Sequence, residues 1–102
     1  DLGDLIADYL DVLGHSPTTW RSARQARPSL PDMDIVITDV SLDGESGVDL
    51  CRDIGRLVPV IVVSGDPDNK AAALDAGAVI FLLKPVDVVS LGDLVESLAL
   101  AG

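Results

Sequence analysis

Three polar side chains stand at the ends of apolar, β-branched segments, and together their types suit one kind of chemistry. They are Asp39, Ser64 and Lys84. A carboxylate is a competent nucleophile toward phosphorus and forms an acyl phosphate. An ammonium offsets the charge on a transferring phosphoryl group, and a hydroxyl donates a hydrogen bond to it. Each residue alone is equally typical of a loop cap, a turn or a solvated surface, but the combination predicts phosphoryl transfer with Asp39 as acceptor, Lys84 as charge partner and Ser64 as donor.

The segments before these residues are short, continuous and apolar, as strands buried in a parallel sheet are. We expect strands at Ile35–Thr38, Pro59–Ser64 and Val79–Leu83, each buried on both faces. Strands that alternate with amphipathic helices indicate a parallel sheet built from crossover connections. The carboxyl ends of such strands meet at one edge, where ligands bind. The carboxylate, hydroxyl and ammonium are therefore expected to share one pocket.

The helices between the strands follow from apolar spacing and from capping residues. One helix after Gly47 has Leu50, Cys51, Ile54 and Leu57 as its inward side chains. A second follows Asp66, with Pro67 at its first position and Gly77 past its end. The last helix places these side chains on one face: Leu91, Leu94, Val95 and Leu98. Nearer the start we expect a helix over 2–13 that ends at Gly14, an edge strand at 18–20 and a weak helix over 21–27.

Length and composition restrict the function classes. A chain of 102 residues is predicted to be one domain, residues 1–102. Its net charge of −10 argues against direct binding of nucleic acid. No apolar run approaches the roughly 18 residues of a membrane span, so we expect a soluble, cytoplasmic chain without a membrane partner. The single cysteine, Cys51, is expected to be a small buried side chain rather than a reactive thiol.

Three stretches of the sequence resemble the receiver (response regulatory) domains of two-component signal transduction. The run IVITDVSLDGESG at 35–47 is similar to the phosphorylation strand and loop, with Asp39 as phosphoacceptor and Gly47 eight residues later. PVIVVSG at 59–65 resembles the fourth strand with its switch hydroxyl, Ser64. AGAVIFLLKP at 76–85 resembles the fifth strand, with Phe81 as the switch aromatic before Lys84-Pro85.

The resemblance implies a flavodoxin-like α/β fold, a doubly wound parallel sheet of (βα)5 type with strand order 2-1-3-4-5. It implies a phosphoprotein that takes a phosphoryl group from phosphohistidine on a histidine kinase or phosphotransfer domain. It is then no enzyme beyond catalysing its own phosphorylation and dephosphorylation. Ser64 and Phe81 would switch a face made by helix 4, strand 5 and helix 5, which binds a partner or a second copy. The peptide between Lys84 and Pro85 is expected to be cis.

The resemblance also implies Mg²⁺, held by Asp39, by the backbone carbonyl of Ser41 and by two adjacent acidic residues at the end of a first strand. Counting back from Gly14 places that pair upstream of Asp1. We therefore expect the domain to be N-terminally incomplete here, with strand 1 missing and Mg²⁺ bound weakly. Asp43 also stands where the family usually has proline.

Two alternatives belong to other classes. A degenerate receiver would never take phosphate and would act only as a protein-binding module. A haloacid-dehalogenase-like phosphohydrolase also places Asp, Ser or Thr, and Lys at strand ends. That family wants a second Asp two residues after the nucleophile, where this chain has Ser41.

Overall fold

The computed structural model describes residues 33–42, 45–55 and 57–101. These residues fall into two compact units, 33–85 and 86–101, and each is described by itself. No helix among the described residues is long and apolar enough to cross a membrane. The predicted elements at 2–13, 18–20 and 21–27 lie outside the described residues, as does Gly14.

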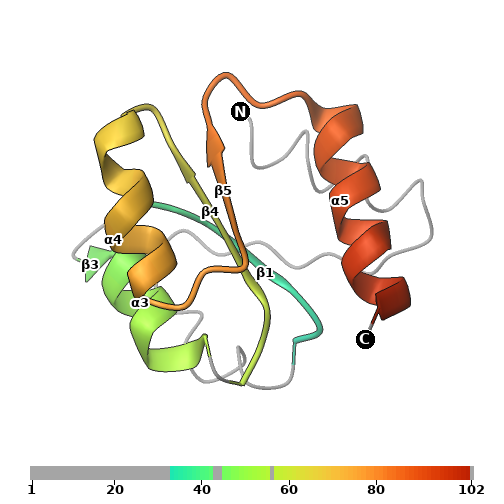
Figure 1. Cartoon of the computed structure of the whole chain (residues 1–102), viewed down its shortest axis with the longest axis horizontal. Helices are drawn as coiled ribbons and strands as arrows, with labels where there is room; N and C mark the ends of the chain where they lie inside the picture. Colours follow the sequence, from blue (N-terminus) through green and yellow to red (C-terminus); the bar gives the residue numbers. More distant parts are fainter. Residues whose placement is uncertain (1–32, 43–44, 56, 102) are drawn as a thin grey trace. The chain divides into compact units, whose positions relative to one another are not determined.

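The larger unit is built on a parallel sheet of three strands in the order β1-β4-β5 (Figure 1). The strands are β1, Val36–Asp39, β4, Val60–Ser64, and β5, Ile80–Leu83. The central strand β4 is buried at every residue. Its run of Val and Ile has the continuous apolar character that burial on both faces requires. The predicted strands thus exist, with bounds that differ by one residue at their starts and, for β1, at its end.

Two of the three predicted strands are less buried than expected. In β1, Val36 and Thr38 are buried, but Ile37 and Asp39 are only half-buried. Ile80, Phe81 and Leu82 of β5 are half-buried, and Leu83 is exposed. The reason is position: within the described sheet, β5 pairs with β4 on one side and lies at the edge on the other. The sequence pattern indicates that a strand is apolar, but its place in the sheet decides how much of it is covered.

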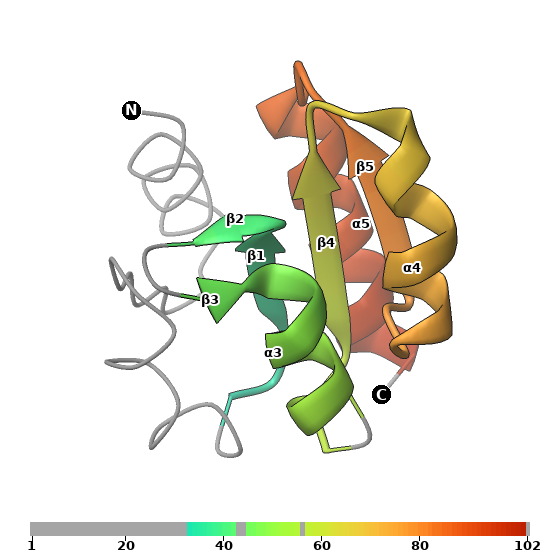
Figure 2. The ribbon, with the colours of Figure 1, turned by 90° about the vertical axis from the view of Figure 1, so that its left-hand side faces the viewer.

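A short antiparallel ribbon follows β1, where only a loop is predicted. It consists of β2, Ser41–Leu42, and β3, Glu45–Ser46, and it leads directly into the first described helix (Figure 2). Its pairing sets Ser41 opposite Ser46. The ribbon brings the chain back on itself, so that the helix begins next to the end of β1.

Helix α3, Gly47–Ile54, begins at a serine cap. The Ser46 hydroxyl accepts a hydrogen bond from the Val48 amide at 3.1 Å, which satisfies one of the free amides of the first turn. Its buried side chains, Leu50, Cys51 and Ile54, are three of the four predicted. The fourth prediction is wrong: Leu57 is 67% exposed, because the helix ends at Ile54 and Leu57 lies in the turn that follows.

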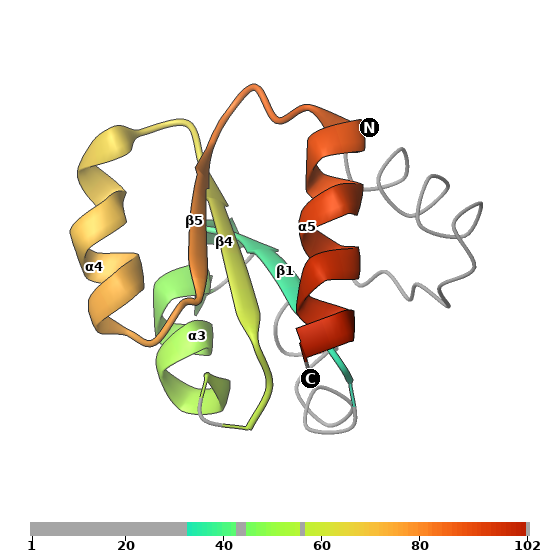
Figure 3. The ribbon, with the colours of Figure 1, turned by 45° about the vertical axis from the view of Figure 1, so that its right-hand side comes forward.

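The next connection contains a 3₁₀ turn, η2, Pro67–Asn69, followed by helix α4, Lys70–Asp75. The Asp66 side chain caps the turn and Pro67 starts it, as predicted. Gly77 follows the helix with φ of +105°, a conformation that side chains with a Cβ rarely adopt. Helices α3 and α4 contact each other and lie on the same face of the sheet (Figure 3).

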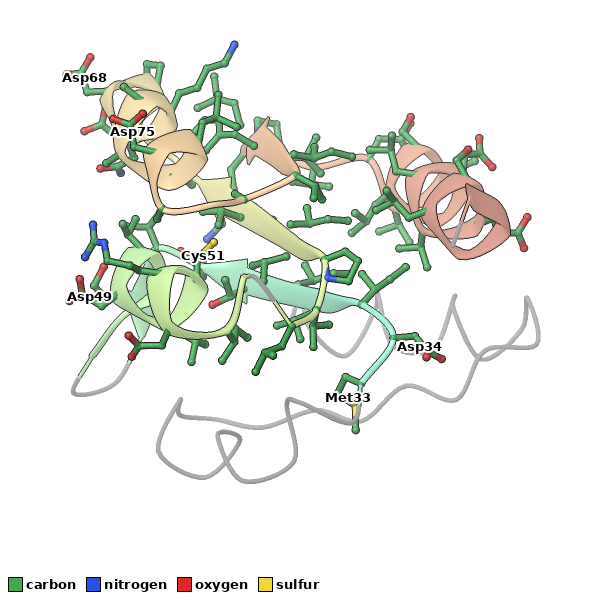
Figure 4. All side chains as sticks on the ribbon, turned by 60° about the horizontal axis from the view of Figure 1, so that its bottom comes forward. Met33, Asp34, Asp49, Cys51, Asp68 and Asp75 are labelled. Carbon is green, nitrogen blue, oxygen red and sulfur yellow. The ribbon has the colours of Figure 1, made fainter. Side chains whose placement is uncertain are left out.

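Figure 4 shows how α3 and α4 divide their side chains between the interior and the surface. Cys51 points inward from α3 and is fully buried, whereas Asp49, Asp68 and Asp75 are exposed. Burial raises the pKa of the Cys51 thiol, and the nearby Arg52 charge partly opposes that shift. Cys51 is therefore the small buried side chain that was predicted.

The smaller unit contains helix α5, Val88–Ala101. Asp87 caps it, because its carboxylate accepts hydrogen bonds from the Val89 amide at 3.0 Å and from the Ser90 hydroxyl at 3.1 Å. Of the predicted inward face, Leu91 and Val95 are buried, and Leu94 and Leu98 are half-buried. The spacing of these side chains on a helix is confirmed.

Candidate functional site

The strand ladder brings the ends of all three strands to one edge of the sheet. Asp39 pairs with Val63, one residue before Ser64, and Ser64 pairs with Leu83, one residue before Lys84. Backbone hydrogen bonds continue the ladder beyond the strands: the Val40 amide donates to the Val63 carbonyl at 3.0 Å, and the Lys84 amide donates to the Ser64 carbonyl at 2.8 Å. Asp39, Ser64 and Lys84 therefore lie at neighbouring positions at the ends of adjacent strands.

Asp39 and Lys84 are brought into direct contact. The Lys84 ammonium donates a hydrogen bond to the Asp39 carboxylate and forms an ion pair with it, although the two residues are 45 positions apart. Their side chains are 36% and 38% exposed, so the pair is accessible from solvent. The Lys84–Pro85 peptide is cis, as the resemblance predicts.

The Ser64 hydroxyl is hydrogen-bonded away from the Asp39–Lys84 pair in this structure. It is buried and forms its hydrogen bonds with Asp66 and Asn69, in the loop and turn that follow β4. The pleat explains this, because successive side chains of a strand point to opposite faces. Ser64 shares a face with Val62 and with Phe81, the register partner of Val62, whereas Asp39 pairs with Val63 on the other face. Ser64 lies at the shared edge, but its hydroxyl does not join the Asp39–Lys84 pair.

The backbone around Asp39 is held by two close contacts. The Thr38 hydroxyl is buried and donates to the Asp39 carbonyl at 3.0 Å. The Gly47 amide donates to the Val40 carbonyl at 2.7 Å, which places the first residue of α3 directly against this carbonyl edge. A Cβ on Gly47 would lie 1.9 Å from the Asp39 carbonyl oxygen. The glycine is therefore required by the close approach of two backbone segments.

The predicted metal ligands form only part of a magnesium site. Magnesium takes oxygen ligands in octahedral geometry, with one or two carboxylates and several waters. Asp39 offers one carboxylate, which also binds the Lys84 ammonium. The described residues contain no group of three or more acidic, histidine or cysteine side chains that could hold a metal. The described side chains therefore do not fit Mg²⁺ on their own, and we assign no chemical step to it.

Asn69 is the residue of this region that the sequence did not single out. Its side-chain amide donates to the Ser64 hydroxyl at 2.9 Å. A signal was present in the sequence: Asp66 and Pro67 predict a capped turn, and such a turn folds the chain back toward the end of the strand. The identity of the residue that returns to Ser64 depends on the exact turn, which is 3₁₀ rather than α-helical.

Comparisons with known proteins agree on one family. The family model described as "Response regulator receiver domain" matches residues 3–96. The transcriptional regulatory protein BaeR of Escherichia coli is 30% identical over 90 residues, which span 82% of this chain and 38% of BaeR. The response regulator protein PilR of Pseudomonas aeruginosa is 38% identical over 103 residues, which span 90% of this chain and 23% of PilR. The chain thus spans less than half the length of these relatives.

A solved response regulator receiver domain from Clostridium thermocellum is 28% identical, with a TM-score of 0.81, and the match covers 95% of this chain and 84% of that one. The fold is therefore the flavodoxin-like receiver fold that was predicted. The described order β1-β4-β5 agrees with the 3-4-5 part of the predicted strand order, and the edge strand predicted at 18–20 lies outside the described residues. The haloacid-dehalogenase-like alternative finds no support in these matches. The chain belongs to the response regulator receiver domain family, and its function is that of a signalling domain in two-component systems.

Proposed function

We propose that Asp39 accepts a phosphoryl group from a phosphohistidine on a histidine kinase or a phosphotransfer protein. The observation that carries the proposal is the contact between the Lys84 ammonium and the Asp39 carboxylate at the carboxyl edge of the sheet. Family membership supports it, since receiver domains of response regulators interact with such donors. The exposure of both side chains supports access by a donor protein.

The reaction uses few groups. A carboxylate oxygen of Asp39 attacks phosphorus and forms an acyl phosphate, while the P–N bond of the phosphohistidine breaks. The imidazole keeps the electron pair of that bond and takes a proton from solvent. Lys84 exchanges part of its contact with the carboxylate for the phosphoryl oxygens, because charge on these oxygens must be balanced for transfer. The domain acts on its own aspartate and turns over no separate substrate.

The proposal also includes binding of Mg²⁺ at the phosphorylation site and a cytoplasmic location for the domain. Asp39 and the backbone carbonyl of Ser41 would supply two oxygen ligands to the ion, and waters would fill other positions. We expect the domain to work in the cytoplasm, the typical location of receiver domains of this family.

The output is proposed to pass through Ser64 and Phe81. A phosphoryl group adds strong acceptor oxygens, which the Ser64 hydroxyl would satisfy by turning toward Asp39. Phe81 is half-buried on the neighbouring strand and lies on the same sheet face as Ser64, one pleat away. Leu74 on α4 and Leu83 on β5 are 43% and 47% exposed, so a partner or a second copy that binds these elements would cover apolar surface.

The experiment is phosphorylation of the natural full-length protein by acetyl phosphate and Mg²⁺, followed by mass spectrometry of the intact protein. We expect one added phosphoryl group in the parent and none in Asp39→Asn. Asp68→Asn is the matched control, because Asp68 is an exposed carboxylate in the η2 turn and should leave phosphorylation unchanged. Equal phosphorylation of Asp39→Asn and the parent would move the acceptor elsewhere. A parent that gains no phosphate, from acetyl phosphate or from a kinase, would favour the degenerate receiver.

A further inference from the structure

The Ser64 hydroxyl has its complete set of hydrogen bonds inside the loop that follows β4. It donates to the Asp66 carbonyl at 3.2 Å and accepts from the Asp66 amide at 3.0 Å. It also accepts from the Asn69 side-chain amide at 2.9 Å. A serine hydroxyl has one proton to donate and two lone pairs, so nothing is left for another partner. The Ser64 hydroxyl, which would donate a hydrogen bond to a phosphoryl group on Asp39, therefore already makes all its hydrogen bonds within the loop.

Asn69 is aimed at this hydroxyl by the geometry of the turn. The Asp66 carboxylate accepts a hydrogen bond from the backbone amide of Asp68 at 2.9 Å. The backbone amide of Asn69 donates to the Asp66 carbonyl at 3.2 Å. These bonds close η2 and return Asn69 to the strand end. Among the partners of the Ser64 hydroxyl, Asn69 contributes the side-chain contact and Asp66 the backbone contacts. A change at Asn69 therefore removes one bond and leaves the backbone of the turn in place.

We propose that Asn69 is a positioning residue that holds the Ser64 hydroxyl in the loop and so opposes its movement toward phosphorylated Asp39. The inference rests on the proposed roles of Asp39 and Ser64 and goes beyond them, since it assigns the resting state of the switch to a particular side chain. To donate its proton to a phosphoryl oxygen near Asp39, the hydroxyl must leave all three bonds, the donated one and the two accepted ones, because all three partner groups lie in the loop. The population that is ready to bind a phosphoryl group is reduced accordingly, and so is the apparent affinity for it.

The size of the effect follows from the one bond that Asn69 supplies. A neutral hydrogen bond changes such an equilibrium by roughly fivefold in net terms. Asn69 is half-buried, so its side-chain amide can bind water when the Ser64 hydroxyl leaves. The cost of breaking the bond is therefore the net free energy of one hydrogen bond, without the larger penalty of a buried, unpaired amide. Asn69→Ala is therefore expected to tighten the apparent binding of a phosphoryl mimic by roughly fivefold.

The experiment is calorimetric titration of the natural full-length protein with beryllofluoride in the presence of Mg²⁺. Four proteins are compared: the parent, Asn69→Ala, Ser64→Ala and the double variant. Asn69→Ala should bind more tightly than the parent, and in the Ser64→Ala background the same change should have no effect, because the hydroxyl that it releases is absent. Ala72→Ser, a neutral change at an exposed position of α4, should match the parent. An unchanged or weaker affinity of Asn69→Ala, or an equal gain without Ser64, would overturn the proposal.

Hydrogen exchange at the Asp66 amide tests the same contact without a ligand. This amide donates to the Ser64 hydroxyl, so loosening of Ser64 by Asn69→Ala should speed its exchange roughly fivefold. Unchanged exchange would show that Asn69 does not hold Ser64. If the parent binds no beryllofluoride, phosphate acceptance at Asp39 fails, and the Asp66 exchange rate alone decides whether Asn69 holds the hydroxyl.

Discussion

Replacement of Gly47 by alanine is the most direct test of how the site is built. The new Cβ would lie 1.9 Å from the Asp39 carbonyl oxygen and 2.8 Å from its carbonyl carbon. Real Cβ atoms stay beyond 3.0 Å, so the backbone at Asp39 or the start of α3 must move by about 1 Å. Because both contacts are with backbone, no side-chain rotation relieves them. Overpacking of this kind costs about 1–3 kcal/mol, and we expect the upper end of that range.

Alanine also has favourable effects that must be subtracted. In a helix it gains up to about 1 kcal/mol over glycine from propensity and from the smaller entropy of the unfolded chain. The net expectation for Gly47→Ala is therefore a loss of about 2 kcal/mol in the free energy of unfolding. Urea unfolding measures this as a lower midpoint at an unchanged slope. Phosphorylation of the folded variant should also slow, because Asp39 is displaced relative to Lys84.

Gly65→Ala is the control for this prediction. Gly65 directly follows Ser64, and a Cβ there would meet nothing within 4 Å. We expect its stability to stay within about 0.5 kcal/mol of the parent, as at ordinary surface positions. If Gly47→Ala is as stable as Gly65→Ala, the close approach of α3 to the Asp39 carbonyl does not exist in solution, and the argument for the glycine is wrong.

Three further predictions concern the site and the core. Lys84→Ala should slow phosphorylation by acetyl phosphate roughly 100-fold, as loss of one charge-stabilising donor does, whereas Lys70→Ala, an exposed lysine on α4, should not; equal rates would remove Lys84 from the mechanism. Cys51 should react with a thiol reagent only as fast as the protein opens, since it is buried with a raised pKa, and rapid labelling under native conditions would contradict the burial. Because the folded thiol has a pKa raised above its ordinary value of 9.0, the associated stability is present below that pH and is lost as the pH rises further. Ile61→Ala should lower the free energy of unfolding by about 2–5 kcal/mol, because Ile61 is fully buried in β4, whereas Leu57→Ala at an exposed turn should change it by less than about 0.5 kcal/mol.

Local pattern determined much of the fold. Runs of Val and Ile marked β1 and β4 because such side chains suit the strands of a parallel sheet, although only β4 is buried at every residue. Asp66 and Pro67 marked the start of a turn, and Gly77 marked the end of α4, because each has a backbone preference that acts within a few residues. The same locality explains the error at Leu57: apolar spacing continued past Ile54, but the helix had ended.

The site depended both on residue types in the sequence and on the order and register of the strands. The types Asp, Ser and Lys at three strand ends predicted phosphoryl chemistry, and the family comparison supports a phosphoacceptor domain. The contact between Asp39 and Lys84 required the order β1-β4-β5 and its register, which bring together residues 45 positions apart. Register also decided where Ser64 points, because a shift of one residue moves a side chain to the opposite face of a strand.

What the sequence by itself determined was therefore the set of chemical groups and the segments that carry them, since these follow from residue type and from spacing along the chain. Only the tertiary structure decided which groups touch. The Asp39–Lys84 pair, the glycine pressed against the Asp39 carbonyl and the Asn69–Ser64 bond each join segments whose separation is set by strand pairing or by the exact turn. Hydrogen bonds act over about 3 Å, so a register or turn that differs by one residue would make a different site from the same side chains.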